Sequence, residues 1–210
     1  MRSVVFILFM PLWMGNLTAQ RDSTWVRAGS AELVLHPGIY ADFAAFRTNR
    51  PTYPLTGVVN DQDIPVRDLR SGGRMFVRDT TGSRKEVQLD RQWGLSQNNG
   101  VYIRAGIGFY RIGMMGSLCH VLFEQNQRDW DPYGYPFGGS TVRTVQQQYV
   151  LDMETGAFQP FTAATMEVIL ARDEVLKAEW DTLPPKKRGQ EVLVLFLRRY
   201  NERHPLYFPR

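Results

Sequence analysis

The sequence predicts an α+β fold, in which an antiparallel sheet, either a sandwich or a partial barrel, is followed by a C-terminal cluster of three short helices. Short β-prone runs separated by turn residues recur between residues 73 and 160, and this spacing is typical of antiparallel sheets. From residue 162 onward the apolar residues recur with the 3.6-residue period of helices. The chain has 210 residues, of which 43% are hydrophobic, and this is enough to bury a core.

The first nineteen residues have the layout of a secretory signal peptide. Arg2 provides a positive start, residues 4–15 are almost wholly apolar, and small and polar residues lead to a cleavage point after Ala19 or Gln20. A membrane anchor is the alternative, but a helix that spans a bilayer needs about 20 apolar residues. We therefore expect residues 1–19 to be a signal peptide and the protein to be exported, to the periplasm or the extracellular space. We expect no transmembrane segment in the mature chain.

Residues 20–160 are predicted to form a mostly β domain with one short helix near its start. A short strand is expected within Trp25–Leu35, and aromatic residues at helical spacing predict a helix over residues 42–48. Turn residues separate the later strands. Among them is Asn98-Asn99-Gly100, which is typical of a type I′ hairpin because both central positions need a positive φ. The later strands are expected at residues 75–77, 87–89, 92–96, 101–104, 109–112, 118–123 and 142–151.

Residues 161–210 are predicted to be a helical tail that packs on the same domain. Thr162 or Thr165 is expected to cap the first helix, and a second short helix follows it. The third is expected to open at Pro184-Pro185 and to end at Pro205. Proline fits the first turn of a helix but cannot continue one.

The charge distribution does not indicate nucleic-acid binding. The chain has 25 Lys and Arg against 21 Asp and Glu, a net charge of +4 that includes Arg2 of the signal. A nucleic-acid interface needs a concentrated basic face. The densest basic run is Lys186-Lys187-Arg188, which we expect to be a solvated helix start.

No metal site and no cofactor are predicted. His36, His120, His204 and Cys119 lack the spacing of a zinc site. Cys119 and His120 are neighbours on a predicted strand, so their side chains point to opposite faces of the sheet. The single cysteine cannot form an intrachain disulfide, and we expect it to be buried.

No catalytic residues are predicted, because the sequence matches none of the common catalytic templates. Ser117, for example, lacks the G-x-S-x-G motif of a nucleophile elbow. The alternative hypothesis is an envelope hydrolase that acts on a glycan or a peptide. It would require a pocket that gathers carboxylates and a histidine. The candidates are Glu124, Asp129, Asp131 and His120.

The most distinctive segment is an aromatic loop predicted over residues 129–139. Its prolines and glycines fix a shape, and its aromatic side chains offer contact area at low entropic cost. One interpretation is a recognition loop that binds a cell-envelope protein or glycan through Trp130, Tyr133, Tyr135 and Phe137. The other is a long hairpin connection that folds back over the core. The first gives the leading functional hypothesis, an exported, non-enzymatic binding module, and the oligomeric state stays open.

Three stretches of the chain show a family likeness. Gly38–Pro51 fits the pattern G-I/V-Y-x-x-F-x-x-F-x-x-N-x-P. The second stretch comprises Gln92–Ser96, Val101–Ile103 and Phe109–Ile112, and the third is Arg199–Leu206. The chain resembles a family of small exported Bacteroidetes-type proteins that carries no established activity. The resemblance covers most of the mature chain and implies export and a shared fold, but it does not extend to the aromatic loop.

Overall fold

The protein has an α+β fold in which an eight-stranded antiparallel sheet is followed by a cluster of helices, as the sequence predicts. The computed structural model describes residues 25–71, 73–78, 81–106, 108–131 and 139–210. The strands of the large sheet are β12 (Phe158–Pro160), β11 (Gly139–Asp152), β10 (Leu118–Asp131), β9 (Gly108–Met114), β8 (Gly100–Ala105), β7 (Gly94–Gln97), β2 (Gly38–Tyr40) and β3 (Tyr53–Pro54), in spatial order from one edge to the other.

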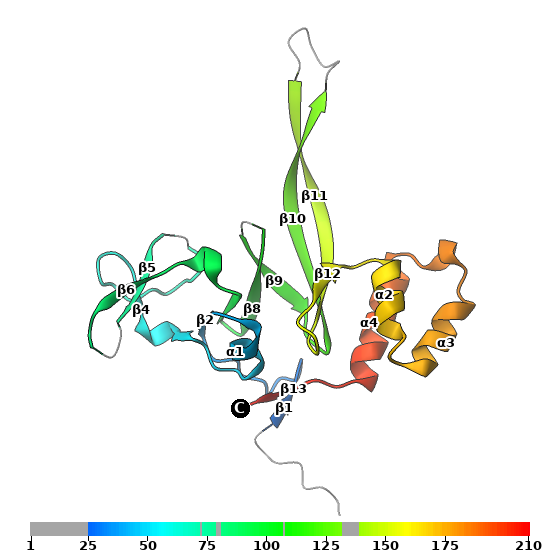
Figure 1. Ribbon diagram of the computed structural model, residues 1–210, viewed down its shortest axis with the longest axis horizontal. Helices are drawn as coiled ribbons and strands as arrows, with labels where there is room; N and C mark the ends of the chain where they lie inside the picture. The colour runs from blue at the N-terminus through cyan, green and yellow to red at the C-terminus, as the bar shows by residue number, and fades with distance from the viewer. Residues whose placement is uncertain (1–24, 72, 79–80, 107, 132–138) are drawn as a thin grey trace, which may run out of the picture.

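Two smaller sheets accompany the large one. The first consists of β4 (Val58–Val59), β5 (Met75–Arg78) and β6 (Arg84–Val87), and the second of β1 (Trp25–Arg27) and β13 (Tyr207–Pro209). The α-helices are α1 (Phe43–Arg47), α2 (Ala163–Leu170), α3 (Glu174–Thr182) and α4 (Gln190–Arg203). The 3₁₀ turns are η1 (Leu55–Gly57), η2 (Leu89–Arg91) and η3 (Pro185–Lys187). In Figure 1, α2–α4 and the three-stranded sheet lie on opposite sides of the long β10–β11 hairpin.

The predicted helix starts are confirmed at the first two positions. Asp42 precedes α1, and its carboxylate accepts a hydrogen bond from the backbone N–H of Ala45 at 2.7 Å. Thr162 caps α2 in the same way, with Thr165 N–H as the donor at 3.2 Å. None of the helices in the described part of the chain is long and apolar enough to cross a membrane.

Two hydrophobic clusters share the base of β10 and β11 as a common wall. Leu118 and Val150 face the cluster built with α2, α3 and α4. The next residues on each strand, Cys119 and Leu151, face the cluster that includes Phe46 of α1. The four wall residues are at most 1% exposed, so the prediction that Cys119 is buried is confirmed. Successive side chains of a strand point to opposite faces, and this places one core on each side of the hairpin.

The Asn98-Asn99-Gly100 hairpin is confirmed, with its turn one residue earlier than the Asn-Gly pattern implies. Asn98 and Asn99 have φ values of 49° and 56°, and Gln97 pairs with Gly100. The two asparagines therefore form the turn, because asparagine tolerates the left-handed region better than most residues. Gly100 begins β8.

β10 and β11 are longer than predicted, and the aromatic loop is correspondingly shorter. The two strands pair in unbroken register from Leu118 opposite Asp152 to Asp131 opposite Gly139. Residues 129–131 therefore belong to β10, and Gly139 belongs to β11. We call residues 122–131 and 139–148 the arm, a two-stranded ribbon that projects from the rest of the protein in Figure 1.

The third helix begins later than predicted. The proline pair Pro184-Pro185 leads into the separate turn η3, and α4 starts after Gly189. Between them, the Arg188 guanidinium lies 4.9 Å from the centre of the Trp180 ring, and its side chain is only 14% exposed. The expectation of a solvated basic run is therefore wrong for Arg188, which packs on the indole by a cation–π contact.

The chain ends in a strand that the sequence analysis does not predict. β13 pairs with β1, with Phe208 opposite Val26. Phe208 is fully buried, and its ring centroid lies 5.4 Å from that of Phe46. The segment predicted to be a helical tail thus returns to the β part of the protein. A three-residue strand is too short for sequence alternation to reveal it.

A single amide side chain fastens α4 to β10. Asn201 Oδ1 accepts a hydrogen bond from Leu118 N–H at 2.7 Å, and Asn201 Nδ2 donates one to the Leu118 carbonyl at 2.8 Å. Gly116 makes room for this contact, because a Cβ atom there would lie 2.4 Å from the Asn201 amide. The side chain thus pairs with both backbone groups of Leu118, as a neighbouring strand would do.

We expect Asn201→Ala to lower the free energy of unfolding by about 2 to 4 kcal/mol, because two backbone groups of a fully buried residue lose their partners. Thermal or denaturant unfolding measures the change. The control is Glu202→Ala on the exposed side of the same helix, for which we expect a change within about 0.5 kcal/mol. Equal effects of the two substitutions would contradict the role given to Asn201.

Candidate functional site

Four aromatic side chains form a row across the large sheet. Tyr110, Phe123, Tyr149 and Phe158 come from the four neighbouring strands β9, β10, β11 and β12. Successive ring centroids lie 4.6, 5.0 and 4.8 Å apart, with interplanar angles of 36°, 31° and 23°. These separations match the spacing of about 4.8 Å between paired strands. Each ring therefore contacts the next, in a tilted arrangement for the first two pairs and a stacked one for Tyr149 and Phe158. We call these four residues the aromatic row.

The aromatic row forms the floor of a cleft of about 720 Å³. The segment Arg104–Gly106, at the end of β8, provides one wall. Glu124, Asn126 and Gln147, on β10 and β11, also line the cleft. Two clefts beside α4 are smaller, at about 310 and 230 Å³. The cleft over the aromatic row has the size of known ligand-binding sites.

The cleft lies where β9 and β10 separate, a point that we call the fork. The two strands pair only at His120 opposite Met114 and Val121 opposite Ile112, with a register shift between these pairs. Beyond the fork β9 pairs with β8, β10 pairs with β11, and the two hairpins diverge in Figure 1. From Leu122 to the end of the arm, the edge of β10 that faces away from β11 therefore has no strand partner in the described part of the chain. We call it the outer edge of β10.

This arrangement is suited to holding an extended chain. An unpaired strand edge presents alternating N–H and C=O groups that can pair with another strand. Phe123 and Tyr149 each have a ring neighbour on both sides within 4.6 to 5.0 Å, so their ring edges are the parts with which a ligand in the cleft would make contact. Ring edges carry partial positive charge and attract carbonyl oxygens. Arg104 and Glu124 also border the cleft, but strand alternation directs their side chains away from the face of the aromatic row.

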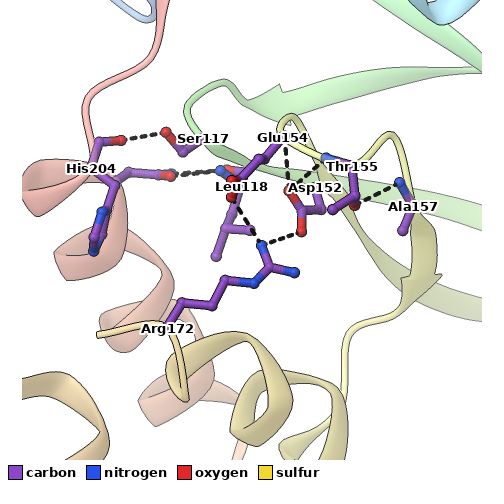
Figure 2. Close-up of polar contacts among 9 residues, drawn as sticks. Ser117, Leu118, Asp152, Glu154, Thr155, Ala157, Arg172 and His204 are labelled. Atoms are coloured by element: carbon purple, nitrogen blue, oxygen red, sulfur yellow. Dashed lines mark hydrogen bonds and ion pairs between the residues drawn. The ribbon is translucent and has the colours of Figure 1, made fainter. Parts of the chain in front are cut away.

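Ser117, His204 and Asp173 have the residue types of a catalytic triad but not its geometry. His204 Nε2 lies 2.8 Å from Asp173 Oδ2. Ser117 Oγ, however, donates to the backbone carbonyl of His204, and Figure 2 shows the imidazole directed away from Ser117. A triad requires the serine hydroxyl to bond to an imidazole nitrogen. Ser117 and His204 instead join the start of β10 to the end of α4.

Asp173 is a buried anion that holds two helices together. Its Oδ1 accepts the N–H groups of Val175 and Leu176, both at 3.1 Å, and caps α3. Its Oδ2 accepts Arg203 Nε at 2.5 Å, and its side chain is 2% exposed. The hydrogen bond from Arg203, supported by those from Leu176 and His204, holds the pKa of this carboxyl far below its ordinary value against the opposite effect of burial.

Asp152 and Arg172 form a second polar tie between the sheet and the helices (Figure 2). Asp152 Oδ2 lies 2.6 Å from Arg172 Nη1. Asp152 Oδ1 accepts the N–H groups of Glu154 at 2.9 Å and Thr155 at 3.3 Å. The carboxylate is thus fully used in closing the turn between β11 and β12 and in fixing the end of α2.

The sequence-predicted binding residues lie largely outside the described part of the chain. Trp130 is on β10, where its backbone pairs with Ser140. Tyr133, Tyr135 and Phe137 fall within residues 132–138, outside the described residues. Their role as a recognition surface stays a prediction. The aromatic row was missed because its members come from four separate strands, whose order in the sheet the sequence does not specify.

The residues of the hydrolase hypothesis are spread along one strand. His120, Glu124, Asp129 and Asp131 all belong to β10. At about 3.3 Å per residue, Glu124 lies about 13 Å from His120, and Asp129 about 30 Å from it. His120 Nε2 is 2.8 Å from Gln148 Oε1, and its ring packs on Phe161 toward the helices. The structure therefore does not bring these groups together.

The candidate metal ligands are also separate. His36 Nδ1 lies 2.7 Å from the Asn49 carbonyl oxygen. Cys119 is fully buried, and burial raises the pKa of its thiol to about 12. Among the residues that the structure describes, no group of three or more His, Cys, Asp or Glu side chains has a metal-binding arrangement.

Comparison of the chain with protein-family models, curated proteins and solved structures finds no match. The functional argument therefore depends on the residues of this chain alone, and the family resemblance noted in the sequence stays a prediction.

We expect Asp173→Asn to lower the free energy of unfolding at pH 7 by about 2 kcal/mol, because the Arg203 guanidinium loses its anionic partner. The low pKa of the folded state means that Asp173 contributes its full stabilisation above its unfolded pKa of about 3.9. This contribution is lost as the pH falls toward the folded pKa. The difference in the free energy of unfolding between wild type and Asp173→Asn should therefore become smaller below about pH 4. Denaturant unfolding at a series of pH values measures this difference.

The control for this substitution is Asp181→Asn, on the exposed side of α3. Asp181 pairs with Lys177 one turn away, and we expect its loss to cost less than about 0.5 kcal/mol. If the difference in the free energy of unfolding between wild type and Asp173→Asn stays constant from pH 7 to below pH 4, Asp173 does not stabilise the fold as a buried anion.

Proposed function

We propose that the protein is an exported, non-enzymatic binding module of the cell envelope, and that it takes up an extended polypeptide segment at the fork. The observation that carries this proposal is the cleft over the aromatic row, bordered by the outer edge of β10. A strand added to this edge gains main-chain hydrogen bonds, and its alternate side chains face the aromatic floor.

A polypeptide fits the cleft better than a glycan does. A sugar ring stacks on the open face of an aromatic side chain, whereas each inner ring of the row has a ring neighbour on both sides. The unpaired N–H and C=O groups of the outer edge match an extended backbone in both spacing and direction. The carboxylates and histidine that a hydrolase would need lie dispersed along β10, so no observation favours that second function.

The proposal is tested by the binding of linear peptides to the immobilised protein. We expect a library of extended peptides of about ten residues to yield binders, since this length covers the usual range of strand lengths. A parallel glycan array should yield none. Tyr110→Ala should weaken peptide binding about tenfold, because truncating an aromatic residue at a binding hot spot typically costs more than 1 kcal/mol. Alanine at Trp130, Tyr133 and Tyr135 tests the separate prediction of a recognition loop, for which we expect lost partner binding and an intact fold.

The matched control is Phe109→Ala. Phe109 is the neighbour of Tyr110 on β9, is similarly half-buried, and packs against the core beside the three-stranded sheet. If Phe109→Ala and Tyr110→Ala weaken binding equally, the loss reflects general destabilisation and not the cleft. Binding to glycans alone would overturn the proposal.

A further inference from the structure

Along the outer edge of β10, the alternate residues of one face form a sequence that is complementary to its own reverse. Residues 122–130 read Leu-Phe-Glu-Gln-Asn-Gln-Arg-Asp-Trp and are centred on Asn126. On the face of Asn126, Glu124 mirrors Arg128 and Leu122 mirrors Trp130, whereas on the other face two glutamines mirror each other and Phe123 mirrors Asp129. The acid thus mirrors the base, and one large apolar residue mirrors another.

Two copies of a strand can join their edges in antiparallel fashion around a two-fold axis. This axis is perpendicular to the sheet, so side chains that point to one face in the first copy point to the same face in the second. Directly opposite residues must have side chains on the same face. The axis therefore passes through a residue of each strand's register and not between two residues. Among centres at Gln125, Asn126 and Gln127, only Asn126 places Glu124 opposite Arg128. The two-fold symmetry doubles every such pair, and cross-strand pairs of opposite charge are stabilising.

The length of the unpaired edge fits the same register. Val121 is the last residue of β10 that pairs with β9, and β10 continues to Asp131. A register centred on Asn126 places the partner's Trp130 opposite Leu122, the first residue beyond the fork. The nine-residue segment therefore occupies the part of the edge that makes no backbone pairs with β9, and the Tyr110 ring of β9 contacts Phe123 near the start of this segment.

We propose that the strand taken up at the fork is β10 of a second copy of this chain, paired antiparallel about Asn126. This inference rests on the proposed strand addition and names the strand that the edge fits. The two arms then form a continuous four-stranded sheet with one body at each end. A two-stranded ribbon is only marginally stable in water, and two added strands supply the pairing that it lacks.

The outer edge of β11 does not offer the same complementarity. Residues 139–148 contain one charged residue, Arg143, so self-pairing of this strand can form no ion pair between opposite charges. The edge of β11 is also closed at its base, where β12 pairs with residues 149–151 and Phe161 N–H donates to the Gln148 carbonyl at 2.8 Å. The charge pattern therefore selects β10.

The test is a charge exchange, read by sedimentation or light scattering of the purified protein at about 1 to 100 µM, the range in which micromolar association is measured. We expect a dimer. Glu124→Arg and Arg128→Glu should each weaken association about tenfold, because each places like charges opposite one another twice. The double variant Glu124→Arg/Arg128→Glu restores both pairs and should associate within about threefold of wild type.

Asp61→Arg, on an exposed turn next to β4, is the control because it changes net charge by the same amount as Glu124→Arg. We expect it to leave association unchanged. A monomer at all concentrations overturns the inference, as does a double variant no better than the single ones. The strand-binding function would still stand if such a monomer bound linear peptides in a Tyr110-dependent way. If the protein binds no linear peptide, but dimerises and regains dimerisation in the double variant, then the outer edge of β10 serves self-association and the peptide-binding function is wrong.

Discussion

The constraint on which the rest of the structure depends is that the base of β10 and β11 separates two hydrophobic cores. Leu118 and Val150 are buried on one face, and Cys119 and Leu151 on the other. A shift of the hairpin by one residue would move each of these four side chains to the opposite face of the sheet. Burial in both cores therefore stabilises the same strand register. Asn201 and Asp173 then join the helices to one another and to this wall through buried polar contacts.

The register set at the base continues along the arm, where no core requires it. β10 and β11 stay paired to the end of the arm. The pairing of β9 with β10 ends where Ile112 of β9 lies opposite Val121 of β10. The separation leaves two features side by side: a row of aromatic rings on the floor of a cleft, and a strand edge with unsatisfied backbone groups. Such an edge is a known liability for aggregation, and natural proteins usually cover or blunt it. An edge left open beside an aromatic floor is therefore better explained by binding than by stability.

Sequence reasoning was sufficient for features that local chemistry determines. The fold class, the helix α1, the capped start of α2, the hairpin at Asn98-Asn99 and the burial of Cys119 follow from period, capping and turn preferences. It was insufficient where distant residues decide the outcome. Arg188 is withdrawn from solvent because Trp180 lies within reach, and β13 forms because β1 is beside it. The cleft requires the order of four strands, which no local pattern encodes.

The most direct measurement of the central claim is residue-resolved amide hydrogen exchange of the protein at high dilution, where self-association is minimal. In a strand paired on one edge only, every second amide bonds to the neighbour and the others face water. We expect the amides from Leu122 to Asp131 to alternate, with protection by β11 at every second position and fast exchange between. Continuous protection along this span would mean that another strand covers the outer edge of β10 in the free protein. That result would contradict an open fork.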